Sequence, residues 1–232
     1  VCETACENFK LACELHIKYD DKKKALLDEN EKFLDKTETV LGEYIAKITR
    51  QNIDEESHKI TTEMIHSISD YERIGDYCIN IASVAEYNLM QKLEFSDECK
   101  NELRLLNQAV SDILLLTKEA YGGDRAAISE VEPLEETIDD LVEILKERHV
   151  ARFQNEQCDT QGGISLIEIL TNLERISDHC SNIAVHVTQR LSDDSSFDPH
   201  AHLKALHKGS SSVYKESLEK YKNLYIAPLS EN

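Results

Sequence analysis

The sequence predicts an all-α protein made of two tandem three-helix bundles that are related by internal duplication, followed by a short helical C-terminal tail. Three observations lead to this fold class. Helix breakers are scarce, with 7 Gly and 3 Pro among 232 residues, which favours long helices. Apolar residues recur every three or four positions through most of the chain, as on one face of a helix. A thirteen-residue pattern also occurs twice.

The apolar periodicity divides the chain into six main helices. Gly122 and Gly123 end the fourth, and Ser96 or Asp97 caps its start. Pro133 predicts a kink or a break inside the fifth. Residues 158–163 are expected to form a loop before the sixth. The expected ranges are 1–16, 22–49, 56–91, 97–120, 124–153 and 164–191.

The last 41 residues differ from the rest of the chain. A joint rich in Ser and Asp is followed by a short helix near 202–207 and a Tyr-bearing amphipathic helix near 212–225. We expect this tail to belong to neither bundle. The predicted units are therefore residues 1–94 for the first bundle, 95–191 for the second, and 192–232 for the tail.

The internal repeat is the most informative feature. Residues 70–82 read DYERIGDYCINIA and residues 172–184 read NLERISDHCSNIA, with eight of the thirteen positions identical. A second match, between residues 20–35 and 124–139, lies at an offset of 104 rather than 102. The difference of two residues falls in the loop between the second and third helix of each half. Each half is thus predicted to be a three-helix unit of about one hundred residues.

The repeated segments carry pairs of acidic residues four positions apart. Such residues lie on the same face of a helix, where two carboxylates repel each other unless a cation lies between them. An asparagine four positions further on extends each stripe on the third helix of each half. The candidate metal ligands are Glu31, Asp35, Glu72, Asp76, Asn80, Glu135, Asp139, Glu174, Asp178 and Asn182.

The chemistry of these residues suits hard cations. Carboxylate oxygens bind Mg, Mn, Ca or iron, and zinc is also possible. No Glu-x-x-His pair occurs on these helices, which argues against a di-iron oxygenase, and we expect no enzyme activity. The alternative is a structural polar seam, in which Glu72 pairs with a lysine of the next helix. Gly75, inside the third helix, indicates close helix packing.

Charge and cysteine content exclude several classes of protein. A net charge of −19 disfavours binding to nucleic acids or anionic lipids. The 7 cysteines include no CxxC pair, so reduced thiols are expected, with Cys78 and Cys180 as small core residues. The sequence contains no apolar run long enough to predict a membrane span. The chain starts at Val1, which suggests a processed protein or a segment of a longer one.

The duplicated motif resembles the PhoU domain family. The signature L-E-R-I-x-D-x-x-x-N-I-A lies at residues 173–184 and, with Tyr for the first Leu, at 71–82; an acid-x-x-x-Asp pair lies on each preceding helix. The resemblance covers residues 1–191. It implies paired three-helix bundles whose acidic motifs bind multinuclear iron or zinc clusters, with manganese or magnesium as alternatives. It also implies a regulatory role rather than catalysis.

The tail resembles the C-terminus of bacterial type II sodium/phosphate cotransporters. We therefore expect a metal-binding regulatory domain of a sodium-dependent phosphate transporter, at the cytoplasmic face of the inner membrane. We expect its partner to be the membrane-spanning part of the same polypeptide. A homo-oligomer is a further expectation, and we expect no nucleic acid partner. The alternative is a free-standing PhoU-type negative regulator of phosphate uptake. A metal-dependent hydrolase and a plain helical scaffold are the remaining alternatives.

Overall fold

The computed structural model describes residues 1–51, 53–156, 158–192, 198–207 and 212–230. These residues form helices, and the six long helices of the sequence prediction are confirmed. The elements are α1 (Cys2–Ile17), α2 (Asp21–Thr49), α3 (Glu55–Gln91), α4 (Asp97–Tyr121), α5 (Arg125–Gln154), α6 (Thr160–Leu191), α7 (Pro199–His207), α8 (Ser212–Tyr225) and α9 (Ala227–Ser230).

The helix starts follow local capping chemistry. The Asp20 and Asp124 carboxylates accept backbone N–H groups at corresponding positions, the starts of α2 and α5. Ser96 caps α4, as predicted, by accepting from the Cys99 amide at 3.2 Å. At the other end of α4, Gly123 takes a φ of 93°, a left-handed conformation that glycine adopts without strain.

One local prediction is wrong. α6 begins at Thr160 rather than Ile164, because Asp159 caps it and accepts from the Gly162 amide at 2.8 Å. The expected loop is therefore shorter, and its two glycines lie inside the helix. α5 continues through Pro133 without a break, so of the two predicted alternatives only a kink stays a prediction. A proline removes one hydrogen bond from the helix ladder, and the packing of α5 against neighbouring helices offsets that loss.

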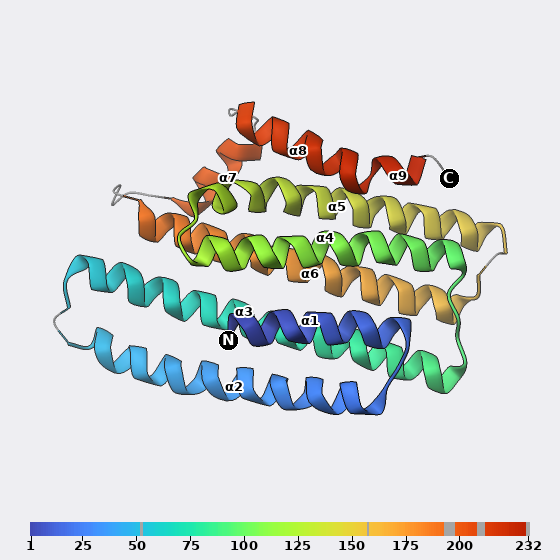
Figure 1. The fold of residues 1–232 in the computed structure, drawn as a ribbon, viewed down its shortest axis with the longest axis horizontal. Helices are drawn as coiled ribbons and strands as arrows, with labels where there is room; N and C mark the ends of the chain where they lie inside the picture. The colour runs from blue at the N-terminus through green and yellow to red at the C-terminus, as the bar shows by residue number, and fades with distance from the viewer. Residues whose placement is uncertain (52, 157, 193–197, 208–211, 231–232) are drawn as a thin grey trace.

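The two halves meet through their third helices. α3 packs along α6; α1 and α2 pack on α3, while α4 and α5 pack on α6. Figure 1 shows the result as a stack, with α2 at one margin and α8 at the other. The buried residues of both halves form one continuous hydrophobic core, to which Leu34 and Ile74 of the first half and Ile138 and Ile176 of the second contribute. The duplicated three-helix architecture is confirmed, whereas the exact domain boundaries stay a prediction.

The tail packs on the second bundle, contrary to the expectation that it belongs to neither. α8 lies along α5 and touches α4. Tyr221 donates to the Glu130 carboxylate at 2.8 Å. Tyr214 and Tyr225 likewise donate to carboxylates, those of Glu136 and Asp112. The tyrosine rings supply apolar area while their hydroxyls bond to acidic side chains, so an amphipathic helix can dock on an acidic surface.

Among the described residues, no helix combines the length and the apolar character that crossing a membrane requires.

Candidate metal-binding sites

The first carboxylate cluster lies between α2 and α3. Asp35 and Glu38 of α2 and Glu72 of α3 each place an oxygen within 4.8 Å of the other two. The helices approach closely here because α3 carries Gly75, where an added Cβ would lie 2.7 Å from Leu34 Cδ1. The close packing predicted from this glycine is confirmed. It brings the acidic stripes of the two helices together.

Mutual repulsion and burial shift the acidity of this cluster. Burial, followed by the Asp76 and Glu38 carboxylates, raises the pKa of Glu72 to about 7. The pKa of Glu31 is raised by burial and then by Asp76 and Asp35. Burial also raises the pKa of Asp76. Arg73 lies 3.9 Å from Glu72, but its side chain is largely exposed, so it compensates little of this negative charge.

The second cluster lies at the corresponding place between α5 and α6. Glu135 and Asp139 of α5 and Asp178 of α6 offer oxygens within 4.8 Å of one another. Glu174 lies beside them and binds Lys146, with Nζ to Oε2 at 2.7 Å. The acidic residue with a lysine partner is therefore Glu174. The structural alternative in the sequence analysis had placed such a lysine beside Glu72 instead.

Electrostatic strain is greater in this second cluster. Burial, followed by Glu132 and Asp139, raises the pKa of Glu135 to about 9. The pKa of Asp139 is raised to about 7 by burial and then by Asp178 and Glu174. Burial and then Glu174 raise the pKa of Asp178. Without a cation, carboxylates held this close are therefore partly protonated at neutral pH.

Two acidic residues of these clusters were missed by the sequence analysis. Glu38 follows Asp35 by three positions and so shares its face of α2. Glu132 precedes Glu135 by three positions, is buried, and accepts a hydrogen bond from Ser181 at 2.5 Å. A search for acidic residues three as well as four positions apart would have found both. The repeat could have found Glu132, because its counterpart Asp28 is also acidic, but it could not have found Glu38, whose counterpart is Val142.

The two asparagines are arranged differently from each other. Asn80 Nδ2 donates to Asn172 Oδ1 at 3.2 Å, a bond that joins α3 to α6. Asn182 is exposed on α6. Their role as carbonyl ligands stays a prediction. Cys78 and Cys180 are fully buried core residues, as expected, and all seven cysteines are free thiols.

The donor atoms present fit a hard cation. Within the described residues, both three-residue groups consist of carboxylates, whose oxygens are the ligands of Mg, Mn, Ca and iron. Asp139 Oδ1 is buried and has no hydrogen-bond partner in the structure, so an acceptor is available inside the second cluster. A bound cation would compensate the repulsion that raises the pKa values of these groups. Glu135, Asp139 and Asp178 would hold it in one half; Asp35, Glu38 and Glu72 would hold it in the other.

Together, the fold and the clusters define a duplicated helical-bundle protein with one acidic site in each half. The PhoU domain model matches residues 1–85 and 103–187, and the chain belongs to the PhoU domain family. No curated protein sequence matches the chain significantly.

Two solved structures share the fold. PhoU from Pseudomonas aeruginosa superposes with a TM-score of 0.76 at 20% identity, covering 82% of this chain and 91% of that one. The phosphate transport system regulatory protein PhoU from Streptococcus pneumoniae gives a TM-score of 0.65 at 15% identity, covering 84% of this chain and 95% of that one. At these identities the likeness shows the arrangement of the helices.

Proposed function

We propose that this chain is a metal-binding regulator of phosphate transport of the PhoU type, with one cation site in each half. The observation that carries the proposal is the pair of carboxylate clusters at corresponding places in the duplicated fold. Iron or zinc is the proposed metal, with manganese or magnesium as alternatives. The ions would hold α2 against α3 and α5 against α6, so metal occupancy would control the packing of each bundle.

Two forms of such a regulator are compatible with the family. A free-standing negative regulator of phosphate uptake accounts for the comparisons better than a transporter domain, because the matched solved structures are PhoU proteins covered over 91% and 95% of their length. The domain of a sodium/phosphate cotransporter, with its location at the inner membrane, stays a prediction from the tail sequence. The free-standing form is therefore the one we propose.

Metal content tests the site directly. We expect the purified chain to contain bound metal by mass spectrometry, or to bind it after incubation with iron, zinc or manganese. The variant Glu72→Ala/Asp76→Ala/Glu174→Ala/Asp178→Ala should lose that metal, because it removes ligands or neighbouring carboxylates from both clusters. Glu143→Ala/Glu147→Ala, which removes two exposed acids of α5, is the matched control and should retain it. Equal metal content in all three proteins would contradict the proposed sites.

Phosphate uptake tests the regulatory role. Deleting the gene in its source organism should raise high-affinity phosphate uptake in phosphate-replete cells, measured with labelled phosphate. The intact gene should restore the low rate, and the four-residue variant should not. An uptake rate unaffected by the deletion would contradict the function even if the chain binds metal.

A further inference from the structure

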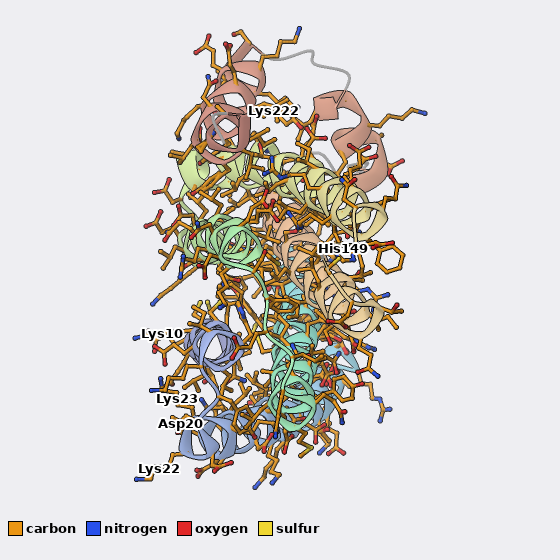
Figure 2. All side chains as sticks on the ribbon, turned by 90° about the vertical axis from the view of Figure 1, so that its right-hand side faces the viewer. Lys10, Asp20, Lys22, Lys23, His149 and Lys222 are labelled. Carbon is orange, nitrogen blue, oxygen red and sulfur yellow. The ribbon has the colours of Figure 1, made fainter. Side chains whose placement is uncertain are left out.

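A cavity of about 420 Å³ lies at the end of the first bundle, between the turn that follows α1, the C-terminal end of α3 and the linker that leads into α4. A second cavity, of about 560 Å³, lies between α1 and α4 and shares Ile17 and Arg104 with the first. Figure 2 views the molecule from this end and shows Lys10, which lines the second cavity, on α1. Both volumes are typical of small-molecule sites in proteins.

The charge of the first cavity is opposite to that of the whole chain. Three cationic side chains line it, those of Lys18, Lys100 and Arg104. Glu94 is the one carboxylate among its described lining residues. Burial lowers the pKa of His16, which also lines the cavity, so its imidazole adds no charge at pH 7. A chain of net charge −19 therefore carries a local excess of cations here, which attracts an anion.

The cations of this cavity are only weakly engaged within the protein. Lys100 Nζ lies 3.8 Å from Asp97 Oδ1, but the Asp97 side chain is fully exposed, so this ion pair contributes little. Arg104 donates to the Asn101 side chain, which carries no charge. Neither cation thus has a buried carboxylate partner, and both can bind an anionic ligand.

The corresponding turn of the other half lacks these side chains. At the repeat offset of 104, Lys18 and Tyr19 correspond to Gly122 and Gly123. The duplicated fold therefore forms this turn with neither a cation nor an aromatic ring. The presence of both in the first half indicates a role that the second half does not share.

Two amide oxygens beside these cavities lack a hydrogen-bond partner. Asn88 lines the first cavity, and its Oδ1 is buried and unpaired among the described residues. Asn107 lines the second cavity and is 9% exposed. Its Nδ2 lies 2.7 Å from His16 Nε2, whereas its Oδ1 is unpaired in the described part of the chain. A buried acceptor left unpaired is unfavourable, so each of these oxygens favours a ligand that donates an N–H group.

These features together define the chemistry of the ligand. Lysine and arginine bind phosphate groups through charge-assisted hydrogen bonds. Tyr19 and Phe95 line the first cavity and offer aromatic rings, on which a nucleobase can stack. The amino group of a purine is an N–H donor for Asn88 Oδ1. A fatty acid lacks that donor, and inorganic phosphate lacks the ring, so a purine nucleotide matches all three features.

We propose that the cavity at the ends of α1 and α3 binds a purine nucleoside diphosphate. Lys18, Lys100 and Arg104 bind the two phosphates, because three cations balance most of the charge of a diphosphate. The base lies against the aromatic rings and donates to Asn88. No member of the two carboxylate clusters lines either cavity, so the nucleotide site does not depend on the proposed metal sites.

Isothermal titration calorimetry of the whole chain tests the site, with ADP and GDP as probes and a chelator present to exclude metal-bridged binding. At least one probe should bind, and its nucleoside and pyrophosphate should each bind at least tenfold more weakly. Arg104→Ala should weaken binding at least tenfold. Arg50→Ala, which removes an exposed arginine at the far end of α2, should leave it unchanged. Circular dichroism checks that both variants fold. No binding of either probe, or equal weakening by both variants, overturns the proposal.

A second variant tests the contact with the base. Asn88→Leu removes the acceptor and should weaken nucleotide binding roughly tenfold while leaving pyrophosphate binding unchanged, whereas Arg104→Ala should weaken both. An Asn88→Leu protein with the parent affinity for the nucleotide would exclude this contact and with it the proposed ligand class.

The nucleotide site and the metal sites can be told apart with one further protein. Glu72→Ala/Asp76→Ala/Glu174→Ala/Asp178→Ala should bind the nucleotide as tightly as the parent, whether or not it loses metal. Loss of nucleotide binding in this folded variant would place the ligand at the carboxylate clusters and overturn the proposal.

Discussion

Replacing Glu135 with glutamine is expected to stabilise the metal-free protein at pH 8. In the folded state, burial and neighbouring carboxylates raise the pKa of Glu135 to about 9, so this group resists ionisation that the unfolded chain permits near its ordinary value of 4.5. A tenfold change in proton affinity corresponds to ~1.4 kcal/mol. We expect Glu135→Gln to add on the order of 2 kcal/mol at pH 8, or roughly 4–8 °C in Tm.

The sign of the pH dependence follows from the same groups. Between the ordinary and the raised pKa values, the folded state binds more protons than the unfolded state. The stability due to Glu72, Glu135 and Asp139 is thus fully present below about pH 4. It is lost as the pH rises through about 7 for Glu72 and Asp139 and about 9 for Glu135. The metal-free parent should therefore melt at lower temperature at pH 8 than at pH 5.5, and Glu135→Gln should flatten this difference.

Metal should reverse the ranking of the two proteins. A cation binds the ionised carboxylates, so its affinity rises with pH, and saturation at 100 times Kd adds ~2.7 kcal/mol. The parent should gain this stability at pH 8, and Glu135→Gln should gain less of it because it lacks one ligand. Glu143→Gln, an exposed residue of α5, is the control and should follow the parent. Identical melting curves for parent and Glu135→Gln, with and without metal, would contradict the role of Glu135.

The duplication explains why so much of the architecture is predictable. Asp20 and Asp124 cap corresponding helices, and Glu31/Asp35 and Glu135/Asp139 then fall at the same places along them. A regular helix fixes which side chains share a face, so the sequence could place the acidic stripes before any packing was known. The resemblance to the PhoU domain family followed from the same repeated residues.

The errors occur where long-range packing decides the outcome. Nothing local indicates that Tyr221 bonds to Glu130, because the two residues are far apart in the sequence and meet only when α8 docks. The lysine partner of Glu174 is likewise supplied by another helix. The early start of α6 is different, because the Asp159 cap is local and could have been recognised from the sequence.

Removing Glu102 is expected to produce a large loss of stability. This carboxylate is 3% exposed and accepts two hydrogen bonds from the Arg152 guanidinium, at 2.9 and 2.8 Å. It also accepts from Arg148 Nε at 2.6 Å. Arg148 in turn donates to the Leu229 carbonyl at 3.1 Å, so the network joins α4, α5 and the tail.

Glu102→Ala would leave the buried Arg152 charge without its carboxylate, and breaking a buried pair in this way costs ~3–5 kcal/mol. Urea unfolding should show a lower midpoint with an unchanged slope. Glu98→Ala is the matched control, because Glu98 binds the same arginines from an exposed position, with 52% of its side chain accessible. It should cost under ~1 kcal/mol. If both variants lost the same small amount, the Glu102 network would not be what holds the tail and α5 to α4.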